Sequence, residues 1–266
     1  MQSSDLDFFK AWFAGYSQTF HADDSEDNKN IDLKVYHTSL VCENAALIAG
    51  SEQLDDDNSL IAETAALFHD VGRFAQYSKY KTFRDSISVN HGRLGAEILR
   101  EREIIAHLPA FEQDLIINTV QFHNTFEVPE FGDRQKVFFL RLIRDADKLD
   151  IWRIFAEYYE SPEEDRASAV GLGLPDLPEY SKTVLSCLHK KTLATLSGLR
   201  TLNDFKLMQL SWVFDLNFRQ SFRLLEERHL IQQIASTLPP TDEIAQALAV
   251  VEEFVSEKSG LETNWK

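Results

Sequence analysis

Histidine and aspartate residues recur in this chain on helix faces that are otherwise apolar. They are His37, His69, Asp70, His91, His123 and Asp147. His37 shares its face with Leu33 and Val41, and Asp147 shares its face with Leu140 and Ile143. A single histidine of this kind is usually a satisfied core residue, but burying an unpaired carboxylate is costly, so the whole set asks for a common explanation. Neutral imidazole and carboxylate groups suit divalent transition metals, and the pattern therefore indicates a metal centre.

Asp145 competes with Asp147 for the role of ligand in the same segment. It lies two residues away and therefore faces away from the stripe of Leu140 and Ile143. We predict that Asp147 is the ligand and that Asp145 either supports the ligands or faces solvent. The other histidines have no neighbour pattern that calls for a metal, and we assign them no function. They are His21, His107, His189 and His229.

The charge of the chain bears on its partners. Its 43 acidic residues against 27 basic ones give a net charge of −16, which argues against a nucleic-acid polymer as partner because such binding needs clustered Lys and Arg. The balance reverses locally in residues 72–86, where only Asp85 opposes the basic side chains. These are Arg73, Lys79, Lys81 and Arg84. The segment is either a solvated loop or a place where a small anionic ligand binds.

The ordered set of histidines and aspartates resembles the HD-domain superfamily of metal-dependent phosphohydrolases. The local sequences agree over about residues 31–155: YHTSLVCENA, LFHDVGR, NHGRLGAEIL, QFHN and DADKLD. The chain is also similar to an uncharacterised HD(I/V)GRF-type subgroup, which has a loop with Tyr-x-Thr-Phe and then a His-Gly segment. The resemblance implies an all-α fold, with an HD-domain helical core around a metal site and additional C-terminal helices.

The resemblance also implies a ligand set. His37, His69, Asp70 and Asp147 correspond to the minimal set for one metal, and His91 and His123 match the extra pair of members with two metals. In that arrangement Asp70 bridges the two ions, which would explain why it stands beside His69. The implied cofactors are one or two divalent transition metals (Mn, Fe, Co, Ni or Zn), with Mg as a further option.

The implied activity is hydrolysis of a phosphomonoester or phosphodiester, in a nucleotide or similar small phosphoester, by a metal-activated water. Inositol oxygenase has Lys after HD-x-Gly, whereas this chain has Arg73, and Arg suits bidentate phosphate recognition. We therefore assign Asp70 and Arg73 to catalysis. The predicted substrate contacts are Arg73, Lys81, Arg84, Asn124 and Lys148. Asn124 is equally compatible with a plain helix cap, and helix geometry can turn Lys148 outward.

Other activities stay open. HD-GYP phosphodiesterases double the later histidine and follow it with Gly-Tyr-Pro, whereas this chain has His123-Asn124 and then TFEVPEFGD, so cyclic dinucleotides are not assigned as substrate. A di-iron oxygenase would use the same ligand set. A nucleotide-binding regulatory protein with weak or no catalysis is the third reading, although intact ligands at all six positions count against it.

Helical periods run through most of the chain. We predict helices at residues 5–20, 31–50, 58–70, 88–105, 112–124, 133–159, 181–197, 203–238 and 241–258. Gly72 is expected to end the helix predicted at 58–70. Residues 74–86 are expected to form a short helix and a loop. A Gly- and Pro-rich interruption is expected at residues 161–180, before the helix predicted at 181–197. Residues 21–30 read as an acidic turn, and the helix at 203–238 as broken near Phe218. We predict an HD core at residues 1–175 and a helical extension at 176–266 that packs on it, or alternatively forms a homodimer face.

Cys42 and Cys187 are isolated and fit reduced thiols in a cytoplasmic protein. The first residues lack the basic-then-apolar order of a signal peptide, and no apolar run reaches membrane-spanning length. We therefore expect a soluble protein with a small phosphoester as partner and no membrane.

Overall fold

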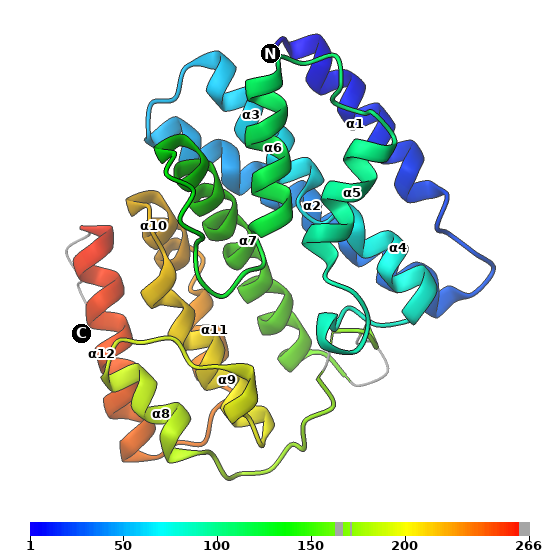
Figure 1. The fold of residues 1–266 in the computed structure, drawn as a ribbon. Coiled ribbons are helices and arrows are strands. Elements are labelled where there is room, and N and C mark those ends of the chain that lie inside the picture. Colours follow the sequence, from blue (N-terminus) through cyan, green and yellow to red (C-terminus); the bar gives the residue numbers. More distant parts are fainter. Residues whose placement is uncertain (163–166, 171, 261–266) are drawn as a thin grey trace. The chain divides into compact units, whose positions relative to one another are not determined.

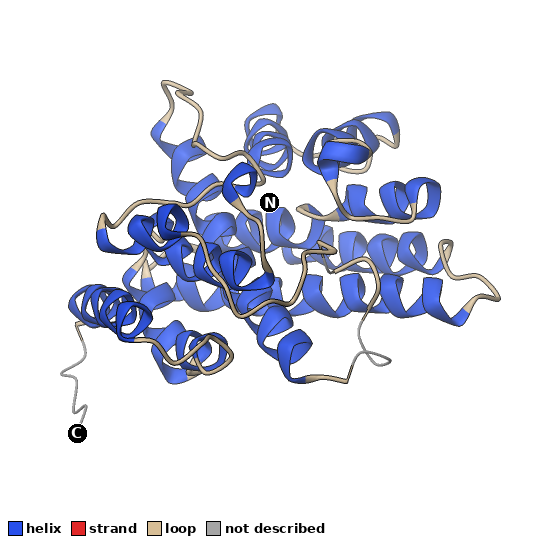
Figure 2. Ribbon diagram, turned by 90° about the horizontal axis from the view of Figure 1, so that it is seen from below, coloured by secondary structure: helices blue, strands red, loops and turns tan. Residues whose placement is uncertain are grey.

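A computed structural model of the protein describes residues 1–162, 167–170 and 172–260. In these residues the chain forms helices joined by turns and loops, and no β-strand (Figures 1 and 2). The all-α prediction is therefore confirmed. No helix in the described ranges is long and apolar enough to cross a membrane, and both cysteines are free thiols.

The chain divides into two compact units. The first contains residues 1–147 and 167–172, and the second contains residues 148–166 and 173–266. Helix α7 (Arg134–Glu160) contributes to both, because the boundary falls between Asp147 and Lys148. The predicted domains at residues 1–175 and 176–266 stay a prediction; the compact units differ from them in grouping the end of α7 with the C-terminal helices.

The first unit holds α1 (Ser3–Gln18), which carries no predicted ligand, and the helices that carry or flank the predicted ligands. The latter are α2 (Ser25–Ser51), α3 (Asp56–Phe68), α4 (Val71–Tyr80), α5 (His91–Glu101), α6 (Ala110–Phe122) and the start of α7. Aromatic side chains of α1 pack against α3 and α4. The ring centroid of Phe9 lies 5.5 Å from that of Phe68, and the ring centroid of Phe13 lies 5.6 Å from that of Phe74. These rings are buried and form part of the core beneath the ligand-bearing segments.

Helix α2 begins earlier than the sequence pattern predicts. The carboxylate of Asp24 accepts hydrogen bonds from the backbone nitrogens of Glu26 and Asp27, at 2.8 and 3.0 Å, and so caps the helix. The predicted acidic turn at residues 21–30 is therefore wrong in its second half, which forms the first turns of α2. Acidic side chains are favourable there because they face the positive end of the helix dipole.

Gly72 does not end a helix. Helix α3 ends at Phe68 and α4 begins at Val71, so His69 and Asp70 form the turn between them and Gly72 lies in the first turn of α4. A Cβ atom on Gly72 would lie only 2.2 Å from the carbonyl oxygen of His91. The glycine is needed because α4 and α5 cross there at backbone contact, and the predicted role of helix stop is wrong.

The second unit contains the end of α7 and the C-terminal helices. These are α8 (Lys182–His189), α9 (Leu202–Ser211), α10 (Arg219–Glu227), α11 (Leu230–Ala235) and α12 (Asp242–Ser259). The predicted break near Phe218 is confirmed, since Phe218 precedes the first residue of α10. A second break falls at His229, whose φ of 54° ends one helix before α11 begins. The indole of buried Trp152 donates to the backbone carbonyl of Gln209 at 3.0 Å, which ties α7 to α9 within this unit.

The predicted interruption at residues 161–180 is described only in part. Residues 163–166 and 171 lie outside the described residues, and the described remainder of this range forms no helix. The helix predicted at 181–197 is shorter than expected and ends at His189.

Candidate metal centre

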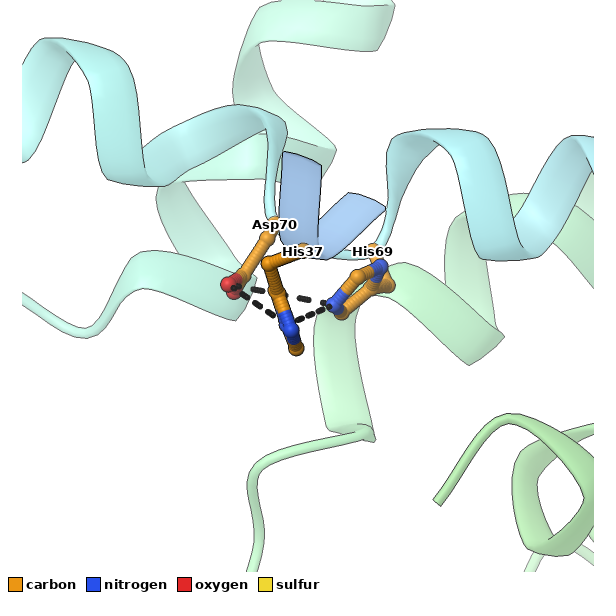
Figure 3. A group of neighbouring side chains, drawn as sticks. All are labelled: His37, His69 and Asp70. Atoms are coloured by element: carbon orange, nitrogen blue, oxygen red, sulfur yellow. Dashed lines mark hydrogen bonds and ion pairs between the residues drawn. The ribbon is translucent and has the colours of Figure 1, made fainter. Parts of the chain in front are cut away.

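The structure brings the six predicted ligand residues of the first unit together. His37 comes from α2, His69 and Asp70 from the turn between α3 and α4, His91 from the first position of α5, His123 from the end of α6, and Asp147 from α7. Figure 3 shows His37, His69 and Asp70 turned toward one another. All are buried except Asp147, whose side chain is 16% exposed. The helices thus bring these polar groups together at one point inside the first unit.

One part of the cluster, which we call the first half-site, consists of His37, His69, Asp147 and one oxygen of Asp70. The Nε2 atom of His37 lies 3.2 Å from that of His69 and 3.2 Å from Oδ1 of Asp147. Oδ2 of Asp70 lies 3.5 Å from Nε2 of His37 and 3.8 Å from Nε2 of His69. Two imidazoles and two carboxylates are a donor set that suits a divalent transition metal.

The other part, the second half-site, consists of His91, His123 and the other oxygen of Asp70. The Nε2 atoms of the two histidines lie 3.0 Å apart. Oδ1 of Asp70 lies 3.3 Å from Nε2 of His91 and 3.7 Å from Nε2 of His123. Asp70 therefore presents a different oxygen to each half-site, as a bridging carboxylate would.

The hydrogen bonds of the histidine rings test whether the cluster fits a cation. Nδ1 of His123 donates to the carbonyl of Val120 at 2.8 Å, and Nδ1 of His91 donates to the carboxylate of Asp85 at 2.8 Å. Because these partners can only accept, Nδ1 carries a proton in both rings, and in the neutral form of either ring the inward-facing Nε2 is unprotonated. Two unprotonated nitrogens 3.0 Å apart cannot form a hydrogen bond with each other, because neither has a proton to donate, whereas both can bind one cation. The residues present fit a metal.

Two rings of the cluster, those of His69 and His91, are neutral at neutral pH. Burial lowers the pKa of His69 to about 4 and that of His91 to about 3, despite nearby carboxylates. Nδ1 of His69 is also fixed, since it donates to the carbonyl of Ala66 at 2.6 Å. Neutral imidazole is the form that binds metals.

The carboxylates of the cluster stay ionised although Asp70 is buried and Asp147 is only 16% exposed. Burial alone would raise the pKa of Asp70, but the charges of Lys34 and Arg73 hold it well below its usual range. Burial likewise opposes ionisation of Asp147, and the hydrogen bond from His37 lowers its pKa. The centre therefore combines the neutral imidazoles of His69 and His91 with ionised carboxylates.

Lys34 belongs to the site, although the sequence pattern did not single it out. Its Nζ atom lies 2.7 Å from Oδ2 of Asp70, and its side chain is only 11% exposed. Nε of Arg73 lies 3.3 Å from Oδ1 of the same carboxylate, so each oxygen of Asp70 has its own cation. A signal was present, because Lys34 precedes His37 by three residues and so shares its helix face.

Asp85 is a second residue that sequence reasoning missed. It was noted only as the acid that opposes the basic segment, yet its carboxylate accepts from His91, Gln76 and Asn124 at 2.8 Å each. A loop aspartate that lies outside any helical period carries no local signal of such a role. Its position is set by the tertiary structure, which brings it into contact with the first residue of α5.

The predicted substrate contacts separate into two groups. Arg73 and Asn124 lie beside the cluster, where Arg73 contacts Asp70 and Asn124 donates to Asp85. The remaining three engage other partners. Lys81 pairs with Asp27, Arg84 donates to the carbonyl of Leu172, and Lys148 pairs with Asp215 in the second unit. As substrate contacts, all five stay predictions.

One alternative for Asp145 is wrong. The sequence pattern left it either supporting the ligands or facing solvent, but the structure buries it completely. Its neighbour Arg144 donates to the carbonyl of His123 at 3.2 Å, so this turn of α7 lies against the end of α6.

The comparisons with known proteins agree with this geometry. The HD-domain family model matches residues 35–152, a range that contains every residue of both half-sites. Comparison with curated proteins and with solved structures gave no match. The family is generally one of metal-dependent phosphohydrolases, and the buried His and Asp groups are compatible with divalent metals. The match of residues 35–152 to the HD-domain family model supports membership of the HD-domain superfamily for this part of the chain.

Proposed function

We propose that this protein is a metal-dependent phosphoric ester hydrolase that acts on a nucleotide or a similar small phosphoester. One or two divalent transition metals would be held by His37, His69, Asp70 and Asp147 and by His91 and His123. The observation that carries the proposal is the placement of Asp70 between two histidine pairs, one for each carboxylate oxygen. The chemistry that such ions supply when bound is activation of a water as nucleophile and stabilisation of charge on the phosphoryl oxygens.

The protein residues would hold this centre in a fixed geometry. His69 and His123 have their Nδ1 protons engaged by backbone carbonyls, so their rings need no rearrangement to turn Nε2 toward an ion. The carboxylate of Asp70 is likewise held in place, in its case by contacts with the side chains of Lys34 and Arg73. Such preorganisation lowers the cost of bringing ligands together when the ions bind.

The cations beside Asp70 support a phosphate group as substrate. Lys34 and Arg73 are 11% and 16% exposed at their side chains, and Asp147 is 16% exposed, whereas the four histidines of the centre are nearly inaccessible. The cluster and its two cations are therefore least buried at these three side chains. An anionic substrate entering there would meet two positive charges, although the chain as a whole is acidic. We propose Arg73 as the first phosphate contact, with Lys34 beside it.

The test is hydrolysis by metal-loaded protein. The purified chain would be stripped of metal and reloaded in turn with Mn, Fe, Co, Ni, Mg or Zn. Nucleoside monophosphates, nucleoside triphosphates and phosphodiesters would then be offered, with product measured by chromatography. We expect turnover with at least one ion and one substrate class, and its loss in Asp70→Asn.

Two other results would replace this proposal. Oxygen consumption by an iron-loaded sample that hydrolyses no phosphoester would favour a di-iron oxygenase on the same ligands. Nucleotide binding without turnover under any metal would favour a regulatory protein. Arg73→Ala with an unchanged KM for the best substrate would contradict the proposed phosphate contact.

A further inference from the structure

The carboxylate of Asp85 collects hydrogen bonds from several elements of the first unit. Asp85 opens the short 3-10 helix η1 (Asp85–Ile87) between α4 and α5, and its side chain is 28% exposed. Side chains of four residues donate to it: His91 at 2.8 Å, Gln76 at 2.8 Å, Asn124 at 2.8 Å and Arg73 at 3.1 Å. One of these donors, His91, is a residue of the second half-site.

We infer that Asp85 is a positioning residue that orients His91 and thereby sets the affinity of the second half-site for a divalent ion. The inference rests on the metal centre of the proposed function and adds a residue outside the ligand set to it. Asp85 would not touch the ion; it would act through the ring of His91.

The need for Asp85 follows from where His91 lies on its helix. His69 and His123 each donate their Nδ1 proton to the carbonyl three residues earlier, an acceptor that the preceding helical turn provides. His91 is the first residue of α5, so no earlier turn of that helix can supply such an acceptor. The carboxylate of Asp85 takes its place, and this leaves Nε2 of His91 directed at Asp70 and His123.

The same carboxylate also connects the two histidines of the second half-site. Asn124 directly follows His123, and its Nδ2 atom donates to Oδ2 of Asp85 at 2.8 Å. Gln76 from α4 donates to the other oxygen and also to the carbonyl of Val89, so it holds the segment that precedes α5. Asp85 is therefore itself held in place, as a residue must be if it is to fix the direction of another ring.

The experiment measures how many ions the full chain binds and the affinity of each. Metal-free wild type, Asp85→Ala, Asp85→Asn and Asn124→Ala would be titrated with Mn²⁺ by calorimetry, with bound metal checked by elemental analysis. We expect two ions in wild type. In Asp85→Ala the second ion should bind ~10- to 100-fold more weakly while the first is unchanged. Asp85→Asn, which keeps an acceptor oxygen but loses the charge, and Asn124→Ala should shift the same step less.

A metal-free readout tests the orientation directly. In wild type, imidazole nitrogen spectra should show His91 with its proton on Nδ1, and in Asp85→Ala this tautomer should lose its dominance. The matched control is Asp32→Asn, because Asp32 also contacts a histidine, His21, at 2.8 Å but is 68% exposed. That control should change neither the ion count nor the spectrum of His91.

The inference is overturned if Asp85→Ala binds both ions as wild type does, or if wild type binds no second ion. It is also overturned if Asp85→Ala weakens both ions equally and Asn124→Ala weakens neither, which would indicate a general loss of structure. A wild type that binds two ions but hydrolyses no phosphoester would refute the proposed function, while the binding difference between wild type and Asp85→Ala would still support the role of Asp85.

Discussion

At the scale of single residues, the main feature is a buried carboxylate shared among four imidazoles and two cations. Asp70 is only 3% exposed, and an isolated charge at that depth would be costly. Lys34 and Arg73 offset that cost in the metal-free chain, one at each oxygen. The same oxygens face the two half-sites, so the protein cations and any bound metal ions would stabilise the same charge.

Lys34→Met should therefore destabilise the metal-free protein more than the metal-loaded protein. Removing one partner of a buried pair costs about 3–5 kcal/mol, and Arg73 should reduce this cost by remaining beside Asp70. A bound ion would replace the missing positive charge. Urea denaturation with and without Mn²⁺ measures the difference, with Lys34→Arg as the conservative comparison. An equal loss of stability in both states would contradict the proposed sharing of charge.

Cys42 should be unreactive over the ordinary pH range. Burial raises the pKa of its thiol to about 12, so the nucleophilic thiolate stays scarce until the pH approaches that value. Alkylation by iodoacetamide at pH 8.5, followed by peptide mass spectrometry, should leave Cys42 largely unmodified in the folded protein. The urea-denatured chain is the control, and equal labelling rates in both states would show that the thiol is accessible.

At the scale of elements, the second half-site depends on a close crossing of helices. Gly72 lets the backbone of α4 approach His91, and Gly95 lies where a Cβ would already meet Val71 and Val120 at 3.2 and 3.1 Å. The crossing places the first residue of α5 beside the turn that carries Asp70. Helix packing at backbone distance therefore brings His91 within reach of Asp70.

Gly72→Ala should disturb both stability and the second half-site. The added Cβ would lie 2.2 Å from a backbone oxygen, which cannot move as the end of a side chain could, and we expect a cost of at least about 1–3 kcal/mol. Thermal unfolding and Mn²⁺ titration would measure the two effects. The control is Gly50→Ala in α2, which has nothing within 4 Å of the added atom and should leave stability unchanged or raise it by up to about 1 kcal/mol. A harmless Gly72→Ala would refute the close crossing.

At the scale of the whole molecule, the chain is strongly acidic, with a net charge of −16, yet gathers cations beside one buried carboxylate. The general charge disfavours polyanionic partners, and the local charge favours a small anion. The residues of the centre come from five separate parts of the first unit, between positions 37 and 147. Ions bound in the two half-sites would link these parts, so metal binding and folding of the unit should be coupled.

Metal should therefore stabilise the protein by mass action. At an ion concentration of 100 times Kd, one site adds about 2.7 kcal/mol to the free energy of unfolding. Scanning calorimetry should show a rise in Tm on adding Mn²⁺, its reversal by a chelator, and no rise in Asp70→Asn. The same rise in Asp70→Asn would mean that the ion binds elsewhere.

Local patterns in the sequence were sufficient to predict much of this protein. Helical periodicity predicted the all-α fold, and polar residues on apolar faces, together with their order along the chain, predicted the six residues that the structure gathers. These patterns can be recognised in the sequence alone because each depends on neighbours within a few turns of one helix. Helix ends were less predictable, as the early start of α2 at the Asp24 cap demonstrates.

Only the tertiary structure determined the contacts between segments that are distant in the sequence. Lys34 meets Asp70 across 36 positions, Asn124 meets Asp85 across 39, and Gly72 is required by the backbone of His91. In the sequence, Asp85 looks like an ordinary loop aspartate and Gly72 like a helix-ending glycine, because nothing in their immediate neighbours indicates these contacts. Lys34 shares the helix face of His37, but its partner Asp70 lies far along the chain. Their roles arise when the packing of α2, α4, α5 and α6 closes around the His and Asp cluster, since burial is what makes a partner for each charge necessary.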